Sequence, residues 1–146
     1  MTVSFSHLGS CGTDLGRSVR FYCDALGFEP VASYRIGAEF SGLMELDGVD
    51  LESRMLRRDG VTIELLGYRS PTATGDGSRR PMNQVGLTHL SLRVDDVDAV
   101  AAAVEALGGS VVRTTRTTMG APGSQLDFVY CTDPDGIRIE LMDLPG

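Results

Sequence analysis

The chain has 146 residues, which is enough for one domain around one hydrophobic core but too few for two independent domains of ordinary size. Its hydrophobic content of 42% and its mean hydropathy near zero are typical of globular proteins. Twenty acidic residues against 13 basic ones give a net charge of -7. Because this charge repels phosphate backbones and anionic membrane surfaces, it argues against binding to nucleic acid or to a membrane.

The sequence also indicates where the protein works. Its first residues, "MTVSFSH", have neither the basic nor the apolar region of a signal peptide, and the longest apolar run, Ala99 to Val104, is too short to cross a bilayer. Three cysteines without CxxC spacing fit reduced thiols rather than a disulfide framework. We therefore expect a cytoplasmic protein.

The first half of the chain predicts a strand, a helix and three further strands. A short segment with His7 leads to Asp14, a residue type that caps helices. A single apolar stripe then predicts a helix that Gly27 ends, and its members are Leu15, Val19, Tyr22 and Leu26. The strands that follow are predicted over residues 28–34, 49–56 and, after an Asp-Gly turn, 61–66, while "GAEFSGLMELDG" fits either a loop or a short helical turn.

The second half repeats this order after a linker of about residues 69–84, which is dense in Pro, Gly, Ser and Thr. His89 lies in the predicted first strand, and a second apolar stripe predicts a helix over residues 97–107. Strands are predicted over residues 110–115, 126–131 and, after a turn at residues 133–136, 137–142. The polar loop at residues 114–125 is long for a compact domain and is a candidate lid.

The two halves are therefore two copies of one βαβββ module, at about residues 4–68 and 85–143 of a single domain that spans residues 1–146. The last strand makes the repeat plain, because "DGVTIELL" returns as "DGIRIELM". Side chains alternate across a strand, so Glu64 and Glu140 point away from the apolar residues on either side of them. A carboxylate at matching places in both copies calls for a shared reason.

The two histidines of the chain supply that reason. His7 and His89 occupy equivalent places in the two modules, so each module contributes one imidazole and one carboxylate. If the modules pack about a pseudo-twofold axis, two imidazole nitrogens and two carboxylate oxygens converge and can bind a divalent metal. We therefore predict that His7, Glu64, His89 and Glu140 are metal ligands.

Paired modules of this kind resemble the vicinal oxygen chelate superfamily, which includes glyoxalase I, methylmalonyl-CoA epimerase, extradiol dioxygenases and the fosfomycin- and bleomycin-resistance proteins. The resemblance runs from Ser4 to about Asp143, and the phrases "DLGRSVRFYCDALGFEP" and "CTDPDGIRIELMD" carry it. It implies an α+β fold in which the two modules form a curved, cup-shaped mixed sheet. It also implies a metal inside the concave surface, held by the four predicted ligands.

Within the superfamily, the order His, Glu, His, Glu of the four predicted ligands is similar to that of glyoxalase I. Methylmalonyl-CoA epimerases commonly carry Gln where this chain has Glu64. Both enzymes move a proton at a carbon next to a metal-bound carbonyl. We therefore predict a metal-dependent isomerase or lyase with Glu140 or Glu64 as the base, Glu140 being favoured, and an acyl thioester or hemithioacetal as substrate. The expected metal is Zn, Ni, Co or Mn rather than Fe, and the expected assembly is a homodimer.

Three further residues share a face with these groups by strand alternation. Ser91 and Arg93 follow His89, and Arg138 precedes Glu140, so we predict that they contact the substrate. Two alternatives stay open. One is an extradiol-type dioxygenase with Fe(II) on His7, His89 and Glu140. The other is a protein that binds an apolar natural product without catalysis.

Overall fold

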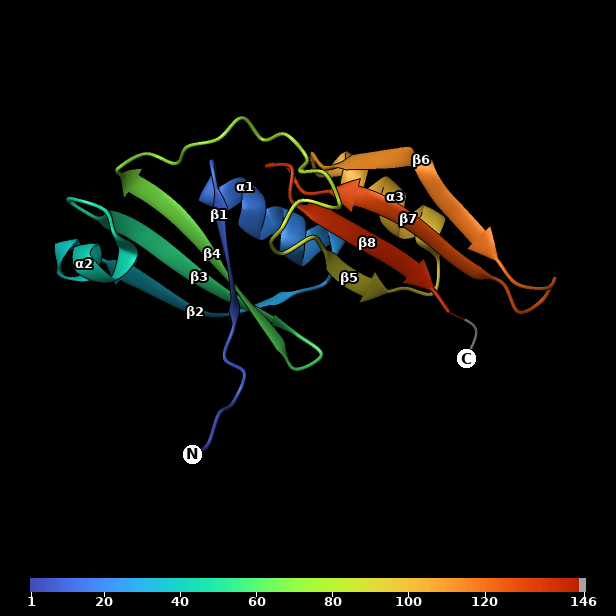
Figure 1. Cartoon of the computed structure of the whole chain (residues 1–146), viewed down its shortest axis with the longest axis horizontal. Coiled ribbons are helices and arrows are strands. Elements are labelled where there is room, and N and C mark those ends of the chain that lie inside the picture. The colour runs from blue at the N-terminus through green and yellow to red at the C-terminus, as the bar shows by residue number, and fades with distance from the viewer. Residues whose placement is uncertain (145–146) are drawn as a thin grey trace. The chain divides into compact units, whose positions relative to one another are not determined.

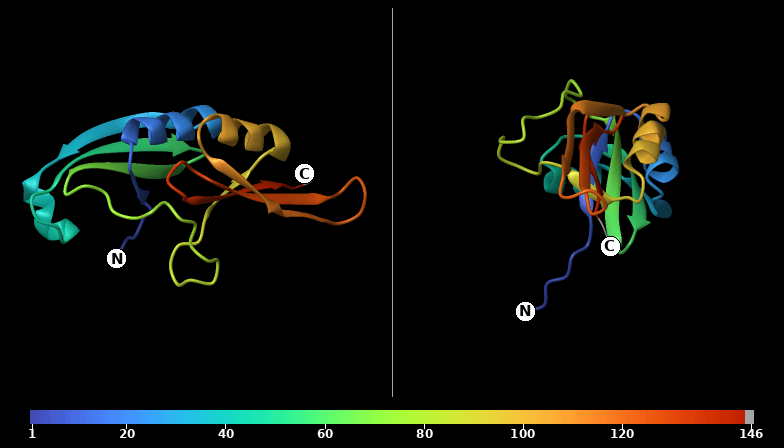
Figure 2. Two further views of the ribbon diagram at one scale, coloured as in Figure 1. Left: turned by 90° about the horizontal axis from the view of Figure 1, so that it is seen from above. Right: turned by 90° about the vertical axis from the view of Figure 1, so that its right-hand side faces the viewer.

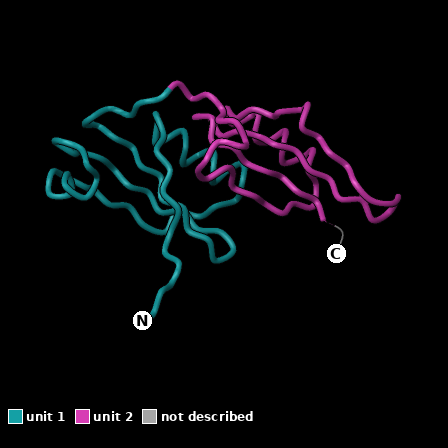
Figure 3. The backbone as a smooth tube through the Cα atoms, in the orientation of Figure 1, with its two compact units in different colours: residues 1–75 teal, residues 76–146 magenta. Residues whose placement is uncertain are grey.

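The structure is a computed structural model that describes residues 1–144, and the chain forms two compact units, Met1–Gly75 and Asp76–Gly146 (Figure 3). Each unit contains one four-stranded mixed sheet and its own helical segments (Figure 1). The predicted α+β fold of two βαβββ modules is thereby confirmed. The boundary between the units falls inside the segment that the sequence predicts as a linker.

Unit 1 begins with a strand and a helix and continues with three strands. In chain order its elements are β1 (Leu8–Gly12), α1 (Leu15–Arg20), η1 (Phe21–Ala25), β2 (Glu29–Ile36), η2 (Ala38–Phe40), α2 (Ser41–Met44), β3 (Asp50–Arg58) and β4 (Val61–Ser70). The sheet order is β1-β4-β3-β2, with β1 parallel to β4 and the other pairs antiparallel. The ambiguous "GAEFSGLMELDG" segment forms the short helical turns η2 and α2.

Unit 2 repeats this topology with five elements. They are β5 (Leu90–Arg93), α3 (Val97–Ala106), β6 (Ser110–Met119), β7 (Leu126–Thr132) and β8 (Arg138–Asp143), and the sheet order is β5-β8-β7-β6. The loop predicted at residues 114–125 is wrong in its first half, because β6 continues to Met119 and pairs there with β7. Its threonines are β-branched, which suits a pleated strand.

In each unit the helix covers one face of the sheet (Figure 2). The side chains beneath it are buried, and they include Leu56, Ile63 and Leu65 in unit 1 and Val129, Ile139 and Leu141 in unit 2. Because side chains alternate along a strand, this core directs Glu64 of β4 and Glu140 of β8 to the opposite face. No helix of the described residues is long and apolar enough to span a membrane.

Both helices begin in the predicted way. The carboxylate of Asp14 accepts a hydrogen bond from the Arg17 backbone N–H, and that of Asp96 accepts one from the Ala99 N–H, each at 2.9 Å. These caps satisfy backbone donors that the first helical turn leaves without a partner. Their equivalence is a further sign of the repeat.

We expect Asp96→Ala to lower the free energy of unfolding by about 1 kcal/mol, because the variant loses the helix cap. Denaturant titration measures this change. The control is Asp47→Ala, which removes an exposed carboxylate outside any helix and should leave stability within about 0.5 kcal/mol of the parent. Equal stability of the two variants would contradict the capping role.

Candidate functional site

The first candidate group lies on the face of unit 1 opposite the helix. Strand β1 runs parallel to β4 with Gly9 opposite Glu64, and His7 precedes Gly9 by two residues. The His7 Nε2 atom therefore lies 3.2 Å from Glu64 Oε2. The histidine was predicted on the first strand, but it stands one residue before β1 and makes no ladder pairing to β4.

Unit 2 builds the same pair from equivalent positions. Strand β5 runs parallel to β8 with Ser91 opposite Glu140, and His89 stands one residue before β5. Here His89 Nε2 lies 3.5 Å from Glu140 Oε2. Both pairs are partly accessible, since 36% of the His7 side chain and 24% of the His89 side chain remain exposed.

A hydroxyl group holds the other ring nitrogen of each histidine. His7 Nδ1 is hydrogen-bonded to Ser6 Oγ, and His89 Nδ1 to Thr88 Oγ1, at 2.9 Å in both cases. When Nδ1 carries the ring proton and donates it to the hydroxyl, Nε2 keeps its lone pair and faces the glutamate. Outer contacts of this kind orient the histidine ligands of metal sites.

The two glutamates are held differently. In unit 1 the hydroxyl of Ser53 on β3 donates to Glu64 Oε1 at 2.6 Å, and the Ser53 side chain is fully buried. In unit 2 the donor is Ser91 on β5, which reaches Glu140 Oε2 at 2.8 Å and is exposed. Glu64 is therefore fixed from within the sheet, whereas Glu140 has a solvent-accessible partner.

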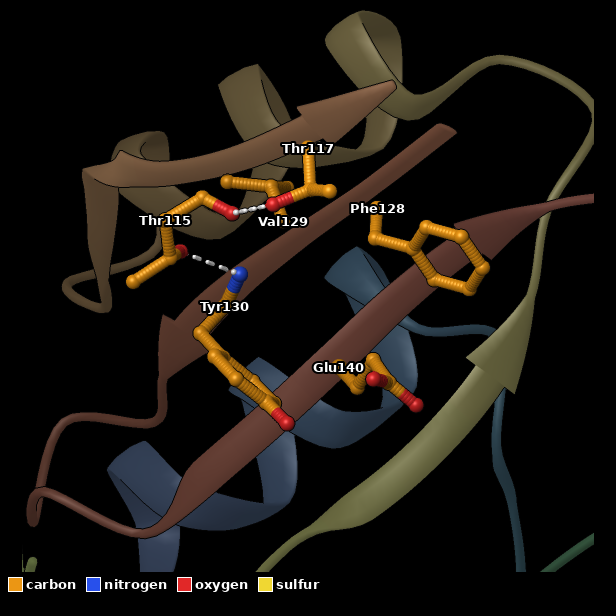
Figure 4. A pocket seen from close by; sticks show the side chains of 6 residues that line it. All are labelled: Thr115, Thr117, Phe128, Val129, Tyr130 and Glu140. Carbon is orange, nitrogen blue, oxygen red and sulfur yellow. Dashed lines mark hydrogen bonds between the residues drawn. The ribbon is translucent and has the colours of Figure 1, made fainter. Parts of the chain in front are cut away.

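Glu140 also lines a pocket of about 210 Å³, together with Thr115, Thr117, Phe128, Val129 and Tyr130 (Figure 4). Tyr130 of β7 stands directly opposite Glu140 in the sheet. Burial raises the pKa of Tyr130, the charge of Glu140 raises it further, and Arg138 acts in the opposite direction. The phenol is consequently protonated at neutral pH.

The ring of Tyr130 contacts two other predicted site residues. Its centroid lies 5.5 Å from that of the His89 ring, in an edge-on arrangement, and 5.3 Å from the guanidinium carbon of Arg138. In unit 1 a different tyrosine, Tyr68, interacts with the glutamate. Burial raises the pKa of Tyr68, and the nearby Cys11 and Glu64 side chains raise it further.

The three residues predicted to contact substrate have other contacts in unit 2. Ser91 bonds Glu140, as described above. Arg93 donates to the Leu144 carbonyl at 2.8 Å, and Arg138 donates to the Arg80 carbonyl at 2.8 Å. Arg138 is buried, and its Nε atom has no hydrogen-bond partner within residues 1–144. Contact of these residues with substrate stays a prediction.

The four predicted ligands thus form two His–Glu pairs. Among residues 1–144, no group of three or more His, Cys, Asp or Glu side chains is arranged to hold a metal ion. Each pair presents an imidazole nitrogen and a carboxylate oxygen side by side, with Nδ1 of the histidine anchored. That donor chemistry suits a divalent metal of the zinc, nickel or cobalt type.

Sequence reasoning missed several residues of this site. A hydroxyl residue precedes the histidine in both copies, as "SH" and "TH", so the repeat itself contained the signal for Ser6 and Thr88. Ser53 and Tyr130 lie on the strands next to the glutamates. Their positions depend on strand register, which residue types alone do not specify.

The chain is similar to known proteins in both sequence and fold. Residues 4–141 match the sequence pattern of the Glyoxalase/Bleomycin resistance protein/Dioxygenase superfamily. The chain is 31% identical to the uncharacterized protein YaeR of Escherichia coli, over 94% of this chain and 93% of that protein. It is 30% identical to the lactoylglutathione lyase of Haemophilus influenzae, over 89% of this chain and 84% of that enzyme. A glyoxalase family protein of Bacillus cereus has a similar structure, with a TM-score of 0.83, 18% identity and coverage of 100% and 97% of the two chains.

We expect Ser53→Ala to destabilise the protein by about 1.5–3 kcal/mol, because the variant removes a buried donor to a charged carboxylate. The control is Ser33→Ala, since Ser33 makes a longer, exposed hydrogen bond of 3.4 Å to Glu52 in the same sheet. That change should cost less than about 0.5 kcal/mol. Thermal and denaturant unfolding measure both. Equal losses would show that Glu64 does not depend on Ser53.

Proposed function

Since this chain belongs to the Glyoxalase/Bleomycin resistance protein/Dioxygenase superfamily, we propose that it is a metal-dependent isomerase or lyase that moves a proton at a carbon next to a carbonyl group. The similarity to a lactoylglutathione lyase over most of both chains supports this reaction class. The substrate we propose is a small molecule, either an acyl thioester or a hemithioacetal.

The observation that carries the proposal is the pair of equivalent His–Glu contacts. In each unit an imidazole Nε2 faces a carboxylate oxygen, at 3.2 Å and 3.5 Å, and a hydroxyl anchors the other ring nitrogen. A single pair offers two donors, fewer than the three or four protein ligands of ordinary zinc sites. We infer that His7, Glu64, His89 and Glu140 hold one metal together.

A bound divalent cation supplies Lewis acidity, which lowers the energy of negative charge on a substrate oxygen. The residues of the chain supply the base. Glu64 is suited to staying in place, because the buried Ser53 hydroxyl fixes one of its oxygens. Glu140 is suited to taking the proton, because it lines the pocket beside Tyr130 and its hydroxyl partner Ser91 is exposed.

We also propose that the protein is a homodimer. β1 and β5 are edge strands, and the segments before them expose alternate apolar residues: Val3 at 87%, Phe5 at 67%, Val85 at 96% and Leu87 at 79%. Exposed apolar residues beside a free strand edge favour association with another chain.

The metal site can be tested without an activity assay. His7→Ala and His89→Ala should each lower the metal content and the metal-dependent rise in melting temperature, because a ligand that binds only the folded state stabilises it. Elemental analysis and thermal unfolding, with and without chelator, measure both effects. Full metal content in the double variant would overturn the site.

The same two variants show whether one chain or two build the site. Chains that carry only His7→Ala are mixed with chains that carry only His89→Ala. The mixture is then unfolded and refolded. If the ligands come from two chains, mixed dimers regain one complete set of ligands and bind metal. If each chain builds its own site, the mixture binds no more metal than the separate variants.

We expect Glu140→Gln to slow exchange of the substrate α-proton for solvent deuterium by roughly two to four orders of magnitude, the usual contribution of a positioned base. NMR follows the exchange in a hemithioacetal of a 2-oxoaldehyde and in an acyl thioester. The control is Glu29→Gln, an exposed glutamate on β2. Unchanged exchange in Glu140→Gln would transfer the base role to Glu64.

Other outcomes would favour a different function. Oxygen consumption with catechols by the iron-loaded protein, without proton exchange, would indicate a dioxygenase. Tight binding of an apolar compound without turnover and without metal would indicate sequestration.

A further inference from the structure

A large bulge in β6 borders the pocket beside Glu140, since Thr115 of the bulge belongs to the pocket lining. Val112 pairs with Tyr130 and Thr117 pairs with Phe128, so four residues of β6, 113–116, stand opposite the single residue Val129 of β7. In unit 1 the equivalent strands carry a much smaller irregularity, with one extra residue between Pro30 and Ala32. Bulges of this kind are features of functional sites more often than defects.

The hydrogen bonds at the bulge show that it is a built structure. Thr115 Oγ1 accepts the backbone N–H of Tyr130 at 2.9 Å and donates to the Val112 carbonyl at 2.7 Å. Thr117 Oγ1 donates to the Thr115 carbonyl at 3.1 Å (Figure 4). Both threonine hydroxyls are thus engaged within β6 and β7. Neither hydroxyl proton is therefore available to a ligand in the pocket.

The neighbouring strand β7 contributes aromatic rings to the pocket lining. Phe128 and Tyr130 both line the pocket, and the ring of Tyr130 contacts His89 and Arg138. By register, the positions of Phe128 and Tyr130 correspond in unit 1 to Ser53 and Met55. The aromatic wall consequently belongs to the second module and is not a property of the repeat.

We propose that this pocket binds a neutral, planar, apolar group of the substrate, of about the size of a phenyl ring. An apolar cavity of about 150 Å³ holds benzene in another protein, so a pocket of 210 Å³ has room for such a ring. Aromatic walls favour a planar group through stacking and edge contacts. In the metal-free protein, Glu140 in the lining disfavours a group with negative charge, because like charges repel.

The position of Glu140 places the pocket next to the base of the proposed proton transfer. A ring in the pocket places the carbon attached to it beside the Glu140 carboxylate, which is the base under the proposed function. The substrate class that follows is an aryl- or similarly substituted carbonyl compound. This statement about substrate rests on the proposed function, whereas binding of the ring in the pocket does not.

Fluorine NMR with 4-fluorobenzyl alcohol tests the pocket directly. The parent protein, freed of metal with a chelator, should bind this probe and should bind the anionic 4-fluorobenzoate at least tenfold more weakly, a difference of about 1.4 kcal/mol. Backbone amide shifts caused by the alcohol should centre on Thr115, Thr117 and Tyr130. Absence of binding, equal binding of the anion, or shifts centred elsewhere would overturn the proposal.

Two variants locate the contact. Phe128→Ala removes a wall and Thr117→Trp fills the space, and each should weaken binding of the alcohol by about tenfold. The control is Tyr34→Ala, which removes an exposed aromatic residue on β2 of unit 1. Parental affinity in Thr117→Trp, a change at an exposed position that leaves the core intact, would exclude this pocket.

A kinetic comparison tests the substrate class. Proton exchange in a phenyl-substituted hemithioacetal should exceed that in its methyl-substituted counterpart, and Phe128→Ala should reduce the preference. If both compounds exchange at equal rates, the claim about substrate fails while the proposed function stands. If neither exchanges, the proposed function and the substrate claim fail, and the binding experiment still decides the pocket.

Discussion

The parallel pairing of the first and last strands of each module is the constraint on which the candidate site depends. In the order β1-β4-β3-β2 the last strand is central and its parallel neighbour is the edge strand at which the module begins. That arrangement places a histidine just before the edge strand next to a glutamate in the middle of its neighbour. Unit 2 repeats it with β5 and β8, so one topological rule builds both His–Glu pairs.

The two His–Glu pairs occupy equivalent positions, but their surroundings differ. A buried serine hydroxyl fixes Glu64, whereas Glu140 shares a pocket with two aromatic residues and a large strand bulge. The internal repeat accounts for the shared part of the site, and the sequence differences between the two modules account for the different parts. On this difference we base the proposal that the first glutamate holds the metal and the second acts as the base.

The module order could be predicted from the sequence because it depends on local signals, and the same signals pointed to the two histidines and two glutamates that the structure brings together in pairs. Apolar periodicity, aspartate caps and glycine stops identify the helices, and two copies of one strand motif locate the glutamates. The extension of β6 to Met119 was not predicted, since a threonine-rich polar segment fits a loop as well as a strand. Ser53 and Tyr130 were not predicted as site residues. Their contacts with the glutamates arise from pairing between distant segments, which a single sequence does not reveal.

We propose that the two His–Glu pairs bind one metal ion together. X-ray absorption at the zinc edge tests this proposal most directly, because imidazole rings give a characteristic scattering pattern from which the number of histidine ligands follows. We predict two imidazole ligands per zinc in the parent protein and one in either His7→Ala or His89→Ala. One imidazole in the parent, or an unchanged spectrum in either variant, would contradict it.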